Sequence, residues 1–176
     1  IKQGSVYIDM STCGPNLIRQ LEPLFNEKGA HILDSPVLSS PLDAPGRGVI
    51  VMIGGDKEIF DSLISMFESF ADNVVYTGRL GTANICKVVH NMTTVAMQQV
   101  VAEGLTLGVK AGVDLETLLD SGSRGPVGAS KDRLSPTVFK NTYNPPVFTL
   151  DLARKDIGLA TELGRESGVP LPVANL

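Results

Sequence analysis

The chain has 176 residues and a formal net charge of −4, with 19 acidic and 15 basic side chains. This length is sufficient for one medium domain or two small ones with a hydrophobic core, and the slightly acidic balance, without any Lys/Arg-rich run, excludes a typical nucleic-acid-binding surface. The longest apolar runs, such as residues 49–53, are far shorter than the roughly 20 residues of a membrane-spanning helix, so neither nucleic acid nor a membrane is an expected partner.

The two cysteines, Cys13 and Cys86, are widely separated and belong to no CxxC or Cys/His grouping. The sequence therefore predicts neither a disulfide framework nor a metal site, and it favours a reduced intracellular setting. The chain begins at Ile1 without a signal peptide and ends in a Pro-containing segment typical of the start of a helix. We expect a fragment of a longer polypeptide, soluble and cytoplasmic, with an organellar location still open because a targeting segment would precede Ile1.

The first 78 residues carry the strand signals. Strands are expected at 6–10, 31–34, 48–53 and 74–76, and helices at 15–28 and from the capping Asp56 to about residue 70. Ser35-Pro36 should end the second strand, because proline lacks a ladder donor and pushes the preceding residue away from helical angles. The order strand, helix, strand, strand, helix, strand is typical of an α/β sheet.

The rest of the chain shows only helical patterns. One long helix is expected from about residue 82 to 111, about 45 Å long at 1.5 Å per residue. A short helix should follow the capping Asp114, then a Gly/Ser-rich turn through Ser130, and finally an amphipathic helix over 151–166. The predicted fold class is therefore α/β followed by all-α.

A polar stripe marks the long helix. Its members recur at spacings of three and four and so share one face: Asn84, Lys87, Asn91, Thr94 and Gln98. The other positions are mostly apolar, which is typical of a buried helix, and a buried ammonium group needs compensating partners. We therefore expect Lys87 to face a cleft. The alternative stays open that its side chain reaches solvent past apolar neighbours.

Four segments along the chain form a pattern of higher specificity. They are Asp9-Met10-Ser11-Thr12, Asp34-Ser35-Pro36-Val37, Gly78-Arg79-Leu80-Gly81 followed by Lys87 and Asn91, and Lys155-Asp156. In order and spacing, they resemble the β-hydroxyacid dehydrogenases, the family of 3-hydroxyisobutyrate, tartronate semialdehyde and phosphogluconate dehydrogenases.

The resemblance implies a division of the chain into two parts. Residues 1–78 would be the C-terminal portion of a Rossmann-type NAD(P)-binding domain, and residues 79–176 a truncated helical domain for substrate binding and dimerisation, built around the long helix. It also implies NAD or NADP as cofactor, a small-molecule substrate, and a homodimer or homotetramer. The chain contains no GxGxxG, which agrees with a pyrophosphate-binding turn upstream of Ile1.

The resemblance implies roles for single residues as well. Lys87 matches the family's catalytic lysine, which holds the substrate oxygen and relays a proton, and Asn91 matches the residue that orients the substrate. Thr12 and Lys155 match residues that contact the cofactor. Without the resemblance, Thr12 would be interpreted as a residue that stabilises a turn, and Lys155 as the partner of Asp151 in a surface ion pair.

The second segment departs from the family pattern. Relatives usually continue it as Ser-Gly-Gly, which cradles the substrate carboxylate, whereas this chain has Leu38-Ser39-Ser40. Ser39 and Ser40 are therefore candidate substrate-binding residues. Their side chains would narrow the approach to the backbone amides, and Leu38 removes a polar group, so we expect carboxylate recognition to be altered or lost.

Three functions follow as hypotheses. The first is an NAD(P)-dependent oxidoreductase that transfers hydride between the cofactor and a small β-hydroxyacid or semialdehyde. The second, suggested by the departure at residues 38–40, is an imine reductase or another carbonyl reductase, although imine-reducing relatives usually replace the catalytic lysine. The third is a non-catalytic assembly protein that retains the fold, with the long helix as its interface.

Overall fold

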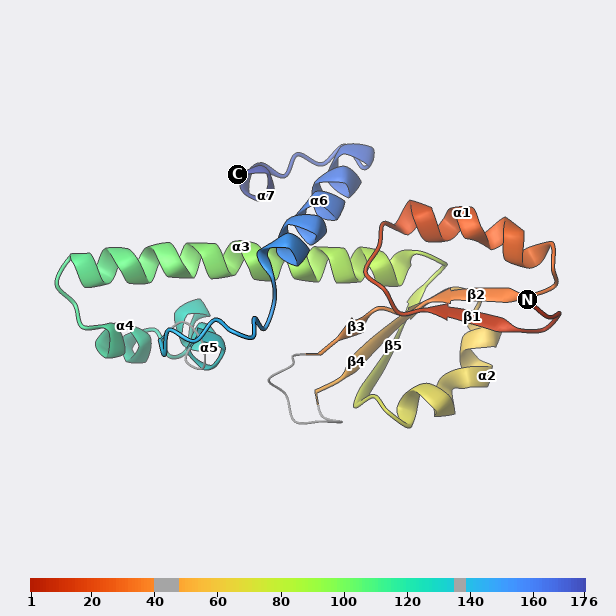
Figure 1. Cartoon of the computed structure of the whole chain (residues 1–176), viewed down its shortest axis with the longest axis horizontal. Coiled ribbons are helices and arrows are strands. Elements are labelled where there is room, and N and C mark those ends of the chain that lie inside the picture. The colour runs from red at the N-terminus through yellow and green to blue at the C-terminus, as the bar shows by residue number, and fades with distance from the viewer. Residues whose placement is uncertain (40–47, 135–138) are drawn as a thin grey trace.

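The computed structural model describes residues 1–39, 48–134 and 139–176. Within these ranges β1 is Val6–Asp9, α1 Pro15–Asn26, β2 His31–Asp34, β3 Val37–Leu38, β4 Ile50–Gly54, α2 Lys57–Glu68 and β5 Asn73–Gly78. The helices that follow are α3 Thr82–Lys110, α4 Leu115–Ser121, α5 Pro126–Leu134, α6 Leu150–Glu166 and α7 Pro172–Asn175. The predicted fold class, α/β followed by all-α, is confirmed (Figure 1).

The described strands form one mixed sheet. β1 pairs in parallel with β2, and β4 pairs in parallel with β5. β2 and β3 act as two parts of one bent strand, since both pair antiparallel with β4. The sequence prediction missed β3, because it took Ser35-Pro36 as the end of a strand. Proline has no N–H to donate, but the carbonyl of Pro36 accepts a hydrogen bond from the backbone N of Met52 at 3.3 Å, and the ladder resumes at Val37.

Helices α1 and α2 cover opposite faces of this sheet (Figure 1). Successive side chains of a strand point to opposite faces, and two neighbours on β2 accordingly enter two separate cores. Ile32 packs with Ile18 of α1, whereas Leu33 packs with Phe60 and Phe67 of α2. The end of β2 is therefore held from both sides, and the segment that follows it has a defined position.

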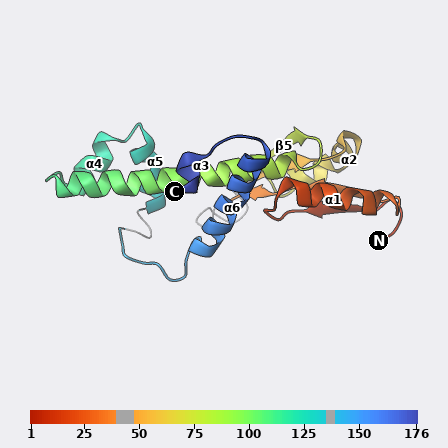
Figure 2. The same cartoon turned by 90° about the horizontal axis from the view of Figure 1, so that it is seen from above.

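Helix α3 leaves the sheet and extends well beyond it. Helix α6 crosses α3 near the sheet, and α4 and α5 pack near its far end (Figures 1 and 2). The expectation of a buried helix is correct for one side only. Val101 and Leu105 are buried against Leu119 of α4, whereas Val100 and Leu107 are 61% and 72% exposed. No helix in the described ranges combines the length and apolarity needed to cross a membrane.

The expected Gly/Ser-rich turn through Ser130 is wrong in part, because it contains the start of α5. Pro126 opens this helix, a position where its fixed φ and missing N–H are favourable. A Cβ added to Gly128 would lie only 2.3 Å from the carbonyl oxygen of Ser123. Glycine is thus needed there for a close backbone approach rather than for a flexible turn.

Candidate active site

The site forms where the end of β2 meets the start of α3. Asp34 is fully buried, and its carboxylate accepts hydrogen bonds from the backbone N of Gly81 at 2.7 Å and of Asn84 at 2.8 Å. The first N–H groups of a helix lack partners within it, so Asp34 caps α3 from a distant strand. Gly81 adopts a φ of 87°, which favours glycine. Asp34 thereby fixes the position of the first turns of α3, which carry Lys87.

Lys87 faces inward from the second turn of α3. Its side chain is half-buried, and Nζ donates a hydrogen bond to the carbonyl oxygen of Val37 in β3 at 2.8 Å. Burial lowers the pKa of Lys87 from its usual 10.5; the negative charge of Asp156 raises it in part, and the positive charge of Lys155 lowers it further. The hydrogen bond to Val37 favours the expected inward position over the alternative that the side chain reaches solvent past its apolar neighbours. An amine of this kind releases its proton more readily than a surface lysine, and its neutral form can then accept a proton from a ligand.

Asn91 lies one turn after Lys87 and contacts helix α6. Its side-chain Nδ2 donates a hydrogen bond to Oδ2 of Asp156 at 2.6 Å. Asp156 is almost completely buried, and its other oxygen, Oδ1, forms an ion pair with Nζ of Lys155 at 2.9 Å. The carboxylate therefore joins an amide on α3 to an amine on α6.

Lys155 connects this cluster to the loop after β1. Its Nζ donates a hydrogen bond to the backbone carbonyl of Thr12 at 2.9 Å, although Lys155 is 143 positions further along the chain. The predicted surface pair of Lys155 with Asp151 is not among the ion pairs of the described residues. The amine instead links α6 to the loop that begins at the carboxyl end of a parallel strand.

The structure thus brings together four of the six predicted site residues: Lys87, Asn91, Thr12 and Lys155. Ser39 is exposed and follows β3, only two residues from the carbonyl that Lys87 contacts. Ser40 lies outside the described residues, so its predicted role is not addressed by the structure.

The sequence reasoning gave no role of its own to Asp156, although it quoted this residue within a motif. Asp156 shares its face of α6 with Ala160 and Gly164, and all three are buried. A carboxylate at an inward helical position is the signal that would have identified it, because buried charges require partners.

The polar stripe of α3 divides into different environments. Asn84 is fully buried and structural: its Nδ2 donates to Asp34 at 3.3 Å, and its Oδ1 accepts from the backbone N of Cys13 at 3.1 Å. Thr94 is half-buried, and Gln98 is exposed. Only the middle of the stripe, with Lys87 and Asn91, belongs to the candidate site.

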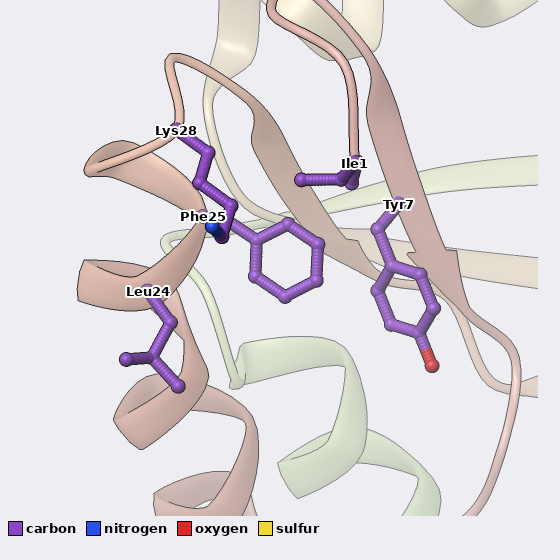
Figure 3. Close-up of a pocket in the computed structure, with 5 residues that line it drawn as sticks. All are labelled: Ile1, Tyr7, Leu24, Phe25 and Lys28. Carbon is purple, nitrogen blue, oxygen red and sulfur yellow. The ribbon is translucent and has the colours of Figure 1, made fainter.

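A separate hollow lies between β1 and α1. It has a volume of about 210 Å³ and a lining that is mostly apolar, formed by the residues drawn in Figure 3: Ile1, Tyr7, Leu24, Phe25 and Lys28. None of these residues contributes to the cluster around Lys87. Within the described ranges, no three His, Cys, Asp or Glu side chains are grouped so as to hold a metal ion.

Two family models together match almost the whole chain. Residues 81–176 match the model described as the NAD-binding part of NADP-dependent 3-hydroxyisobutyrate dehydrogenase. Residues 1–78 match the NAD-binding domain of 6-phosphogluconate dehydrogenase.

Individual relatives agree with these matches. Glyoxylate/succinic semialdehyde reductase 1 of Arabidopsis thaliana is 33% identical over 178 residues, which cover 99% of this chain and 60% of that protein. The human cytokine-like nuclear factor N-PAC is 26% identical over 175 residues, covering 99% of this chain and 32% of that protein. A structure of 3-hydroxyisobutyrate dehydrogenase from Mycobacterium tuberculosis with L-serine superposes with a TM-score of 0.80 at 25% identity, covering 99% of this chain and 62% of that one.

The chain spans about three fifths of the length of the first relatives that it matches. Over that length the order of the strands and helices, the four sequence segments and both family models agree. The chain therefore belongs to the β-hydroxyacid dehydrogenase family.

Proposed function

We propose that the full-length protein is an NAD(P)-dependent oxidoreductase that transfers hydride between its cofactor and a small β-hydroxyacid or the corresponding semialdehyde. The observation that carries this proposal is the environment of Lys87. Its amine is half-buried on the Val37 carbonyl, its pKa is lowered by burial, and Asn91 stands one turn away. The reductase and dehydrogenase names of the relatives from Arabidopsis thaliana and Mycobacterium tuberculosis support the same reaction class.

Lys87 is the proton-transfer residue in this proposal. When the alcohol is oxidised, its carbinol C–H bond breaks and the electron pair leaves with the hydrogen as hydride. The O–H proton passes to the neutral amine of Lys87, and the oxygen becomes a carbonyl. In reduction, the ammonium form returns the proton to the oxygen. A lowered pKa makes the neutral, proton-accepting form of the amine easier to reach than it is for a surface lysine.

Thr12 and Lys155 would hold the nicotinamide end of the cofactor, which supplies the hydride acceptor or donor when bound. The loop after β1 fits this role, since ligands of open α/β sheets bind beyond the carboxyl ends of parallel strands. Lys155 fixes the backbone of that loop through the Thr12 carbonyl. The loop thereby stays next to the cluster of Lys87 and Asp156.

The substrate would lie between Lys87 and the segment after β3. Asn91 would orient it, and Ser39 with Ser40 would contact its acidic end. We further propose that residues 1–78 and 79–176 are two domains, as the sequence predicts, and that the protein is a homodimer or homotetramer. The compartment in which it works is proposed to be the cytoplasm.

Replacement of Lys87 by alanine in the full-length protein tests the proposal. We expect a loss of turnover on the order of 100-fold or more, because the variant lacks both the group that transfers the proton and the amine that binds the substrate oxygen. Lys110→Ala, an exposed position at the end of the same helix, is the matched control and should keep wild-type activity. Full activity of the Lys87 variant would exclude this mechanism.

A substrate panel separates the remaining alternatives. β-Hydroxyacids, semialdehydes and cyclic imines are compared with NAD(H) and NADP(H) in the wild-type protein. Preference for cyclic imines would favour the imine reductase alternative. If the protein shows neither cofactor binding nor turnover, that result would favour a non-catalytic protein. This alternative is kept open by the relative named as a nuclear factor.

A further inference from the structure

Asp156 is a charged side chain buried at the centre of the candidate site. Only 2% of its surface is exposed, and a carboxylate this buried requires partners. Among the described residues, one oxygen accepts a hydrogen bond from Asn91 Nδ2, and the other, Oδ1, accepts no hydrogen bond but lies 2.9 Å from Lys155 Nζ in an ion pair. Both partners are residues to which the proposed function gives a direct role.

Asp34 provides a contrast within the same chain. It is also buried, but its carboxylate accepts from the backbone N–H groups of Gly81 and Asn84. Those contacts hold a helix terminus, which is a structural task. Asp156 has no such backbone contact among the described residues, so the two buried carboxylates serve different purposes.

The contact with Asp156 determines which way the Asn91 amide faces. A carboxylate only accepts hydrogen bonds, so the NH₂ group of Asn91 must point toward Asp156. The amide carbonyl oxygen is then directed to the other side. An asparagine without such a partner can turn its amide by 180° and exchange a donor for an acceptor toward a ligand.

The second oxygen of Asp156 restrains Lys155. The side chain of Lys155 is 44% exposed, and its amine contacts the carboxylate on one side and the Thr12 carbonyl on the other. Without Asp156, the Thr12 carbonyl would be the one contact from the described residues that keeps the long side chain of Lys155 at the loop after β1. The ion pair also brings negative charge to a cluster that otherwise contains two lysines.

We infer that Asp156 is a positioning residue for the proposed reaction, which fixes the Asn91 amide in one orientation and holds Lys155 against the loop after β1. This inference rests on the proposed function. It assigns to Asp156 no contact with substrate or cofactor, and its effect on the rate is transmitted through Asn91 and Lys155.

A double-mutant cycle on kcat/KM in the full-length enzyme tests the path through Asn91. Asn91→Ala and Asp156→Ala should each reduce kcat/KM by on the order of 10- to 100-fold, and the double variant should be no worse than about the more damaged single variant. Residues that act as one unit are non-additive, whereas a general structural role of Asp156 would give the product of the two effects. If the loss of kcat/KM in the double variant equals the product of the two single losses, the inference is overturned.

Asp156→Asn separates the effect transmitted through Asn91 from the effect transmitted through Lys155. The new amide can still accept from Asn91 through its oxygen, but its NH₂ group cannot pair with the Lys155 amine. We expect a smaller loss than for Asp156→Ala, and Lys155→Met should cost less in the Asp156→Asn background than in the wild type, since Lys155 keeps its contact with the Thr12 carbonyl but has lost its ion pair. An Asp156→Asn enzyme as damaged as Asp156→Ala, or a loss from Lys155→Met as large as in the wild type, would contradict the path described.

A spectroscopic measurement keeps the test independent of folding and turnover. The side-chain ¹⁵N–¹H₂ signal of Asn91, assigned with Asn91→Ala, should move in Asp156→Ala while the signals of buried backbone amides remain in place. Loss of the folded spectrum in both Asp156 variants would make the residue structural and overturn the inference. A wild-type enzyme that turns over no substrate of the panel would refute the proposed function itself, whereas an active wild type with multiplied losses refutes only the role of Asp156.

Discussion

At the scale of the residue, two opposing effects, burial and a nearby negative charge, act on the pKa of Lys87. Removing water from an amine favours its neutral form, and a nearby carboxylate favours the charged form. Lys87 experiences both, since it is half-buried and close to Asp156, and burial is the larger influence. The same residue is therefore suited to proton transfer and unfavourable for the stability of the fold.

The stability of the protein should show this conflict directly. In the unfolded chain Lys87 titrates near 10.5, and in the folded chain its pKa is lower. Between these two values the unfolded state binds more protons, so the free energy of unfolding rises with pH. Below the lowered pKa, Lys87 is charged in both states, and its burial lowers the free energy of unfolding by the full amount.

We expect the free energy of unfolding of wild type, minus that of Lys87→Met, to increase as the pH rises from neutral toward 10.5. Denaturant unfolding of the two proteins at matched pH values measures this difference. Using the difference cancels the titration of all other groups that the two proteins share. A difference that stays constant or falls over this range would show that the pKa of Lys87 is not lowered.

The residues of the site differ in how far the sequence could predict them. Lys87 and Asn91 stand one turn apart on a single helix, so local periodicity was sufficient to place them together. Asp156 contacts Asn91 across 65 positions, and the hydrogen bond depends on how α6 crosses α3. No local pattern contains that information. The family resemblance identified Thr12 and Lys155 as site residues, but it did not predict the contact between them.

At the scale of the element, the start of α3 is the feature on which the site depends. The sequence placed this start correctly at residue 82, but the carboxylate that caps it comes from β2. Strand β3 was missed for a related reason, since it has two residues and exists only through its pairing with β4. Local signals predict where elements begin and end, whereas these long-range contacts fix where α3 and Lys87 lie against the sheet.

Gly54, at the end of β4, should be intolerant of a side chain for this reason. A Cβ there would lie 2.4 Å from Oδ1 of Asp34 and 3.0 Å from the carbonyl oxygen of Arg79. We expect Gly54→Ala to destabilise the protein by about 1–3 kcal/mol, because it pushes the capping carboxylate out of place. Thermal or denaturant unfolding measures the change.

Gly158→Ala on α6 is the matched control. Nothing lies within 4 Å of a Cβ added at Gly158, and alanine is the better helix former. This variant should be neutral or more stable by up to about 1 kcal/mol. A Gly54 variant as stable as the Gly158 variant would show that the cap tolerates a shift of Asp34.

At the scale of the whole molecule, the composition of α3 is explained by its two faces. The sequence suggested a helix buried nearly all round, because apolar residues surround the polar stripe. One face does pack against the sheet, α6 and α4. The opposite face carries exposed apolar side chains at helical spacing: Val89, Met97, Val100 and Leu107. Exposed apolar stripes of this kind are typical of surfaces that bind another protein.

This stripe should be the surface through which the full-length protein forms its proposed homodimer or homotetramer. Val100 and Leu107 lie seven positions apart and are 61% and 72% exposed, so a lysine at either position would place a charge in a packed interface. We expect Val100→Lys and Leu107→Lys to shift the protein toward monomer in sedimentation velocity experiments. Gln98→Lys, at an exposed polar position on another face of α3, is the control and should assemble like wild type. Unchanged assembly of both stripe variants would place the interface elsewhere, whereas a monomeric wild type would refute the predicted oligomer.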